Sequence, residues 1–160
     1  MQELIKEDYE SLSIEDFRLK VTELEKELFD SDNVLVLKNS KEIDISFPLT
    51  HSFSDGVYIR EMSMKKNTIV IGKIHNRTHT WFLMKGNLLV LTEGGANNYI
   101  APTYVNATAG SRRIIKALED SVFINVHPNP ENTTDIDKLE KELICSSYEQ
   151  YEQYKQIKEK

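Results

Sequence analysis

The spacing of apolar residues near the N-terminus is that of an amphipathic helix. Four of them recur at intervals of four, three and four, namely Phe17, Val21, Leu24 and Leu28. Side chains with this spacing lie on one face of an α-helix, and Ser13 followed by Asp16 is typical of a helix N-terminus. The pattern predicts helix within residues 1–31, including an earlier short helix over 2–11. Its apolar stripe is expected to pack on its own domain or, alternatively, on a partner chain.

From Val34 to His127 the pattern changes to that of short strands. Eight or nine runs rich in Val, Ile, Phe and Tyr follow one another, separated by turn-forming groups such as Ser54-Asp55-Gly56 and Lys85-Gly86-Asn87. Gly and Asn readily adopt the positive φ that tight hairpin turns require. Short strands at regular spacing, with no helical pattern between them, favour an antiparallel β-sandwich or β-barrel.

The segment after His127 returns to a helical pattern. Pro128 and Pro130 end the sheet, because proline cannot donate to a strand ladder. Thr133, Thr134 or Asp135 can cap a second helix whose apolar face consists of Ile136, Leu139, Leu143 and Ile144. The last stretch is either a helix or a frayed tail, with its tyrosines at positions 148, 151 and 154.

These elements predict one mainly β domain with helices at both ends. Residues 1–32 form the N-terminal helical segment, 33–130 the barrel, and 131–160 the C-terminal helix and polar tail. A chain of 160 residues suits a single core, and 39% hydrophobic with 29% charged residues is a globular composition.

The net charge indicates which partners are disfavoured, and the lack of long apolar runs indicates the compartment. A net charge of −6 disfavours nucleic acid and anionic membrane surfaces, which both select for Lys and Arg. No apolar run reaches the length of about 18–20 residues that a membrane span needs, and the N-terminus lacks the apolar core of a signal peptide. The single cysteine, Cys145, cannot form an internal disulfide. We therefore expect a cytoplasmic protein.

Three histidines are the main candidates for chemistry. His75 and His79 flank a short polar hinge, and His127 ends a later strand-like run. Alternate residues of a strand share a face, which groups Ile69, Ile71, Lys73 and His75 in one run and Phe123, Asn125 and His127 in the other. Strand ends meet at a barrel mouth, where three imidazoles with an open position can form a metal centre. The alternative is that the histidines are core and loop residues with structural hydrogen bonds.

Basic residues beside the predicted strands suggest an anionic ligand. They are Arg60, Lys73, Arg112, Arg113 and Lys116, with Arg112 and Arg113 on opposite faces. An Arg or Lys that points into a barrel is costly without a partner, so an inward one would favour a carboxylate or phosphate. The predicted ligand contacts are Arg60, Lys73, Arg112, Arg113, Tyr58 and Asn125. The alternative is outward, solvated or ion-paired charge.

Several segments together resemble the cupin superfamily, and more narrowly the small cupin-like proteins often encoded in bacteriophage and prophage genomes. The likeness covers about residues 45–145 and rests on PLTHSF (48–53), GVYIRE (56–61), GKIHNRTHTWFLMKGNLLVLTEGG (72–95), AGSRR (109–113), ALEDSVFINVHPNPE (117–131) and DIDKLEKELI (135–144). The resemblance implies a small single-domain antiparallel β-barrel of jelly-roll type.

The same resemblance implies a metal site at His75, His79 and His127, with Zn, Fe, Mn or Ni as the cofactor. A metal-binding cupin typically also supplies a Glu shortly after its first histidines. No Glu lies between His79 and Gly86, so this ligand is missing unless Glu61 or Glu93 replaces it.

Three functions stay open on this basis. The first is a small-molecule-binding cupin of phage type with a His-lined pocket, which sequesters a host metabolite. The second is a metal-dependent cupin oxygenase, isomerase or hydrolase that uses the three histidines. The third is a scaffold or assembly protein that acts through its terminal helices. The expected partners are a small molecule and further copies of the chain, as a dimer or higher homo-oligomer, with no nucleic acid and no membrane. A phage-encoded chain would work in the host cytoplasm.

Overall fold

The computed structural model describes residues 12–28, 34–36 and 47–158. The helix expected over residues 2–11 lies outside this part of the chain. The N-terminal helix, α2 (Ile14–Leu28), begins as predicted: Ser13 Oγ accepts from the Asp16 amide at 3.1 Å and donates to its carboxylate at 2.7 Å. These bonds satisfy one of the amides that a helix start leaves unpaired.

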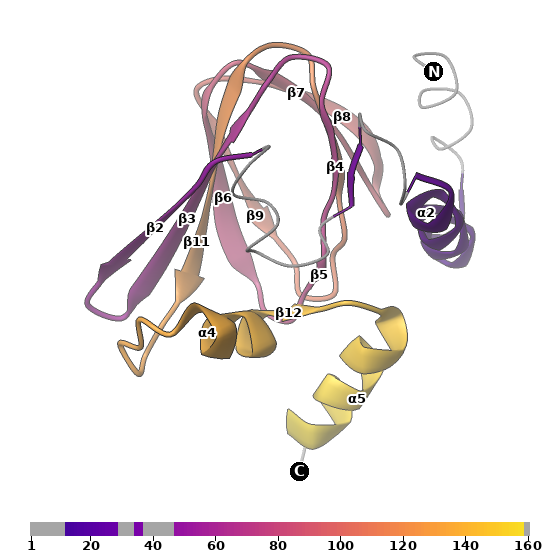
Figure 1. The fold of residues 1–160 in the computed structure, drawn as a ribbon. Coiled ribbons are helices and arrows are strands. Elements are labelled where there is room, and N and C mark those ends of the chain that lie inside the picture. Colours follow the sequence, from indigo (N-terminus) through magenta and orange to yellow (C-terminus); the bar gives the residue numbers. More distant parts are fainter. Residues whose placement is uncertain (1–11, 29–33, 37–46, 159–160) are drawn as a thin grey trace.

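Two five-stranded sheets form the body of the molecule (Figure 1). In order across the first sheet, the strands are β1 (Val34–Val36), β4 (Ile69–Ile71), β10 (Ile114–Ala117), β7 (Asn87–Thr92) and β8 (Gly95–Ile100). The second sheet contains β2 (Leu49–Ser54), β3 (Val57–Met64), β11 (Ser121–Pro128), β6 (His79–Lys85) and β9 (Thr103–Ala107). Every pair in these two sheets is antiparallel except β1 with β4, which is parallel. The prediction of a mainly β, antiparallel barrel with terminal helices is confirmed.

The main core fills the space between the two sheets. It includes Trp81 and Leu83 from β6, Leu88 and Val90 from β7, and Phe123 from β11, all at most 2% exposed. In β6 and β11 they alternate with less buried residues, whereas in β7 Leu91, next to Val90, is buried on the other face against α2. These side chains form the packed part of the barrel interior.

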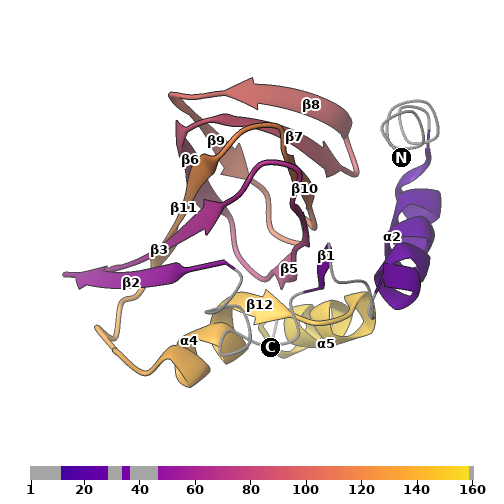
Figure 2. The same cartoon turned by 45° about the horizontal axis from the view of Figure 1, so that its top comes forward.

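The predicted apolar stripe of α2 covers the outer face of the first sheet. Phe17 and Val21 are buried there against Ile69, Ile71 and Leu91. Figure 2 shows α2 beside this sheet, on the side away from β3 and β11. The stripe thus packs on its own chain, while the side chain of Leu28 lies outside the described part.

The predicted grouping of side chains between Ile69 and His75 is wrong. Ile69 and Ile71 face α2, whereas His75 lies inside the barrel. The strand is interrupted at Gly72 and Lys73, between β4 and β5 (Ile74–His75). Because of this interruption, His75 no longer shares a face with Ile69 and Ile71, and its side chain points toward the interior.

The C-terminal segment closes one end of the barrel. Asp135 caps α4 (Ile136–Leu143) by accepting from the Lys138 amide at 3.1 Å. β12 (Ile144–Cys145) then pairs antiparallel with β5, and α5 (Tyr148–Lys158) follows. Figures 1 and 2 both show α4, β12 and α5 across the end of the barrel where β5 lies.

The last stretch is a helix rather than a frayed tail. Tyr151 is buried against Ile74 and Cys145, with Tyr148 and Tyr154 partly buried beside it. The three tyrosines therefore lie along one side, as the helical alternative predicted. Ile144, expected on the face of α4, lies in β12 instead. Among the described residues, no helix combines the length and the apolar character needed to cross a lipid bilayer.

Candidate functional site

The three predicted histidines meet inside the barrel. His75 ends β5, His79 begins β6, and His127 comes near the end of β11, the strand that neighbours β6. Their ring centroids are 4.0 Å (His75 to His79), 4.8 Å (His79 to His127) and 5.4 Å (His75 to His127) apart. One nitrogen from each ring can be chosen so that all three lie within 4.8 Å of one another. All three side chains are buried.

A fourth buried side chain, Arg113, contacts two of these rings directly. Its Nη2 lies 2.9 Å from His75 Nε2 and 3.0 Å from His79 Nε2, with Asn125 Oδ1 3.4 Å away. Arginine has only donors, so both Nε2 atoms must accept. His79 Nδ1 lies 3.2 Å from the Arg77 carbonyl, which suits a donating N–H there. Both imidazoles are therefore neutral, with the proton on Nδ1.

Burial and the nearby cation keep the histidines neutral. Burial, reinforced by Arg113, holds the pKa of His75 well below its usual range and lowers the pKa of His79 to about 4. Burial and His79 lower the pKa of His127 to about 3. Burial also lowers the pKa of Arg113 to about 10, which still leaves the guanidinium charged at neutral pH. The centre thus consists of three neutral imidazoles, two of which contact the cation Arg113.

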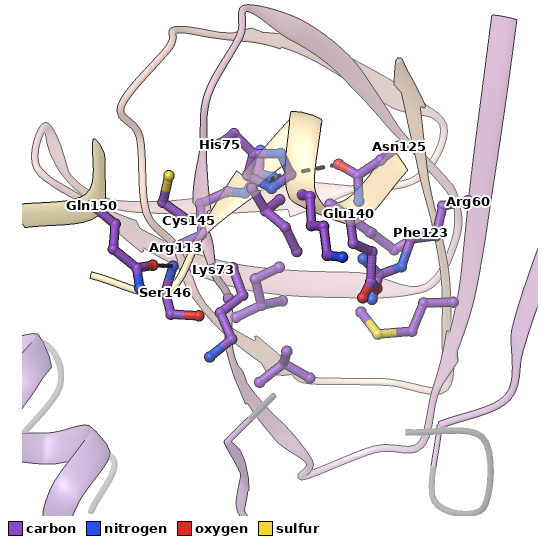
Figure 3. A pocket seen from close by; sticks show the side chains of 16 residues that line it. Arg60, Lys73, His75, Arg113, Phe123, Asn125, Glu140, Cys145, Ser146 and Gln150 are labelled. Carbon is purple, nitrogen blue, oxygen red and sulfur yellow. Dashed lines mark hydrogen bonds between the residues drawn. The ribbon is translucent and has the colours of Figure 1, made fainter. Parts of the chain in front are cut away.

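A cavity of about 370 Å³ lies next to this centre (Figure 3). Its charged lining comprises four cationic side chains, Arg60, Lys73, Arg113 and Lys141, and one carboxylate, Glu140. The apolar part of its wall is formed by Met62, Val70, Ile115, Phe123 and Ile144. Small-molecule sites have this character, with an apolar wall and a few convergent polar groups.

Four of the six predicted ligand contacts line the cavity: Arg60, Lys73, Arg113 and Asn125. Figure 3 shows Arg60 and Asn125 on one side of it, and Lys73 on the other with Ser146 and Gln150. Arg113 Nη1 is buried and has no hydrogen-bond partner among the described residues, and the same holds for the neighbouring His75 Nδ1.

Arg112 and Tyr58 are not among the lining residues. Arg112 is 1% exposed, donates from Nε to the Gly72 carbonyl at 2.9 Å, and forms an ion pair with Glu25 of α2 at 2.7 Å. It therefore joins the helix to the barrel. Tyr58 is buried in a cluster with Leu139 and Leu143, and its hydroxyl lies 2.8 Å from His51 Nδ1.

Neither candidate carboxylate reaches the histidines. Glu93 accepts from Arg18 Nε at 2.7 Å and from the Tyr148 hydroxyl at 3.4 Å. Glu61 alternates along β3 with Arg60 and Met62, which line the cavity, so it lies on the opposite face. Within the described residues, the group of potential metal ligands at this centre consists of the three histidines alone.

The donor set is that of a metal site, but Arg113 makes the arrangement unsuitable for one. A transition metal binds an imidazole nitrogen at about 2.0–2.1 Å, and it uses the lone pair that now accepts from Arg113. A divalent ion would also add charge directly beside a buried guanidinium. The histidines as they stand do not fit a metal ion.

Part of the cavity wall was not expected from the sequence. Glu140 and Lys141 of α4, Ser146, and Gln150 of α5 line it. They reach it because β12 pairs with β5, a contact between segments about seventy residues apart. Local sequence carries no signal for this pairing. Cys145, the single cysteine, is buried and donates to Asn76 Oδ1 at 2.8 Å.

The comparisons with known proteins concern the fold. No protein-family model matches the sequence, and no curated protein matches it either. The solved structures to which the chain is similar include cupin superfamily proteins. KdgF from a Halomonas species is 13% identical, with 56% of this chain and 82% of that chain covered and a TM-score of 0.47.

Two further structures are similar to the same extent. A cupin superfamily protein from Desulfitobacterium hafniense is 11% identical over 50% of this chain and 76% of its own, with a TM-score of 0.44. A Cupin 2 conserved barrel domain protein from Salinispora arenicola is 13% identical over 59% and 84%, with the same TM-score. Such distant similarity concerns the fold alone and says nothing about ligand or activity.

Proposed function

We propose that this chain is a cupin-like protein that binds a small anionic molecule, through a carboxylate or phosphate group, in the cavity beside the three histidines. The observation that carries the proposal is Arg113 Nη1, a buried donor on a charged group with no partner in the described chain. A buried donor left unpaired costs about 1–3 kcal/mol, and more when it is charged. An anion in the adjoining cavity would remove that cost.

The rest of the lining supports an anion. Arg60, Lys73 and Lys141 add positive charge, and Glu140 is the single carboxylate among the lining residues. The Lys73 side chain is half-buried, and this burial lowers its pKa. A bound anion would stabilise these charges, and two oxygens of one carboxylate or phosphate suit the planar guanidinium.

The alternatives have less support. A metal-dependent enzyme would need the imidazole lone pairs that Arg113 engages. A scaffold acting through its terminal helices would need free apolar faces. Phe17, Val21, Leu139 and Tyr151 are already buried within the chain, which leaves only the scattered side chains of Ile14, Leu19 and Ile157 exposed on the described helices. We place the binding protein, as a homo-oligomer, in the cytoplasm. For a phage-encoded chain this would be the host cytoplasm, where sequestering a host metabolite is the role we propose.

The proposal is tested by adding acetate, succinate, citrate and inorganic phosphate to the purified protein at constant ionic strength. At least one should raise the melting temperature, because a ligand that binds only the folded state stabilises it by mass action. Its affinity, measured by calorimetry, should fall about tenfold or more in Lys73→Met, since a charged hydrogen bond contributes about 1.5–3 kcal/mol.

Lys116→Met is the matched control. Lys116 lies in β10 and is not among the residues that line the cavity, so its loss should leave the affinity unchanged. The proposal is wrong if none of the four anions stabilises the parent protein, or if both lysine variants weaken binding equally.

A further inference from the structure

The position of Arg113 is fixed by the backbone on both sides of it. The Arg113 carbonyl accepts from the Gly72 amide at 2.8 Å, and Ile114 begins the β10 ladder opposite Ile71. Alternation then sends Ile114 toward α2, and Arg113 and Ile115 toward the interior. The ion pair between Arg112 and Glu25 holds the preceding residue on the outer face.

The guanidinium is also enclosed. Arg113 is 4% exposed, and its Cζ lies 5.8 Å from the centre of the Phe123 ring. One amino group, Nη2, serves both His75 Nε2 and His79 Nε2, with Asn125 Oδ1 at 3.4 Å. The guanidinium is therefore held in place by burial and hydrogen bonds, and an ion could displace it only by breaking those bonds.

We propose that the guanidinium of Arg113 is the resident cation of the three-histidine centre, and that it excludes a transition metal from the histidines. Each imidazole Nε2 has one lone pair in the plane of the ring. That lone pair either accepts a hydrogen bond from Arg113 or binds a metal ion, and it cannot do both. The three histidines would therefore be able to bind a metal ion if Arg113 were removed.

The inference stands apart from the proposed ligand. An anion would approach Nη1, whereas the histidines engage Nη2. Metal in the parent protein would overturn the exclusion of metal by Arg113, but it would not decide whether an anion binds, which calorimetry measures. Failure of every anion to bind would overturn the proposed ligand, but it would not change the metal content.

The test is elemental analysis of protein purified without a histidine tag, together with titration by Co²⁺, which absorbs in the visible when bound by protein nitrogen. The parent should contain only trace metal and give no new absorption band. Arg113→Ala should gain about one Co²⁺ per chain, because removal of the guanidinium frees the imidazole lone pairs of a three-histidine site. The double variant Arg113→Ala/His79→Ala should lose that gain.

Two further variants keep the result interpretable. Arg60→Ala removes another cavity cation, which acts on His75 and His127 through its charge but does not engage their nitrogens in the described structure, and it should bind no more metal than the parent. Arg113→Met retains most of the side-chain volume and replaces the alanine variant if that one does not melt cooperatively. The inference is overturned if the parent contains near-stoichiometric metal that His75→Ala loses. It is also overturned if a folded Arg113→Ala protein gains no metal, or if Arg113→Met gains none where the alanine variant does not fold.

Discussion

At the scale of single residues, the centre is determined by how many donors and acceptors each side chain has. Arg113 offers donors only, and His75 and His79 each offer one acceptor when neutral. At Nη2 and the two Nε2 atoms, the three side chains therefore complement one another without a metal. Two buried donors beside them, Arg113 Nη1 and His75 Nδ1, have no partner in the described chain, and Nη1 is where the proposed anion would bind.

Gly86 illustrates a backbone constraint at the same scale. It lies in the turn between β6 and β7 with φ +89°, and an added Cβ would run into Ser121 Oγ and lie 2.6 Å from the Asp120 carbonyl oxygen. Gly86→Ala should lower the free energy of unfolding by about 3 kcal/mol or more, because left-handed strain and a backbone clash add together. Urea unfolding followed by circular dichroism would measure this loss.

Gly56 provides the control for that substitution. Its φ is similar, +71°, but nothing lies within 4 Å of an added Cβ. Gly56→Ala should therefore cost only about 1 kcal/mol, from the left-handed conformation alone. Equal losses in the two variants would show that the clash at Gly86 is relieved without cost.

At the scale of elements, the site depends on where strands are interrupted. The break at Gly72 and Lys73 turns His75 inward although Ile69 and Ile71 face α2. The polar hinge after His75 then returns the chain so that His79 begins the next strand. If β4 continued as a regular strand, alternation would place His75 on the outer face of the sheet, away from His127.

The docking of α2 gives a prediction at this scale. Phe17 is 1% exposed against the first sheet, whereas Leu19 on the same helix is 60% exposed. Phe17→Ala should reduce the free energy of unfolding by about 3–5 kcal/mol, the usual cost of truncating a buried aromatic residue. Leu19→Ala should change it by no more than about 0.5 kcal/mol.

Chemical denaturation of both variants at two protein concentrations is the measurement. A larger loss for Leu19→Ala than for Phe17→Ala, dependent on concentration, would mean that α2 stabilises the protein through a partner chain.

At the scale of the whole molecule, the buried histidines make stability depend on pH. The pKa is about 4 for His79 and about 3 for His127 in the folded state, against an ordinary value of 6.5. Below about pH 6.5 the unfolded chain therefore binds protons that the folded chain does not. Their contribution to the free energy of unfolding is fully present above that pH and is lost as the pH falls, toward 4 for His79 and toward 3 for His127.

Each such histidine adds a slope of up to about 1.4 kcal/mol per pH unit between pH 6.5 and 4. Urea unfolding of the metal-free protein across this range should show the combined fall. His127→Asn should reduce the slope, whatever it does to the stability at pH 7. A slope that is the same in the parent and in this variant would contradict the assignment of His127 as a buried neutral residue.

Much of the architecture follows from local pattern. The period of apolar residues predicts α2, the strands and the two C-terminal helices, because burial of one face imposes that period on the sequence. The strand positions of His127 and Asn125 likewise follow from alternation in a regular strand. The sequence also identifies Arg113 as a residue that would need a partner if it pointed inward.

Other features were decided only by tertiary contacts. The inward turn of His75 depends on an irregular strand, and the placement of Glu140, Lys141 and Gln150 at the cavity depends on the pairing of β12 with β5. No local pattern encodes either, since both arise between segments distant in the chain.

The sequence by itself thus determined the barrel, its terminal helices and a set of three histidines with basic residues nearby. Which group the histidines bind is visible only in the tertiary structure. Three imidazoles can bind a metal or accept from a cationic donor, and the choice depends on which side chain reaches their lone pairs. In this fold that side chain is Arg113, brought there by the alternation of β10 and the ion pair that holds Arg112 outside.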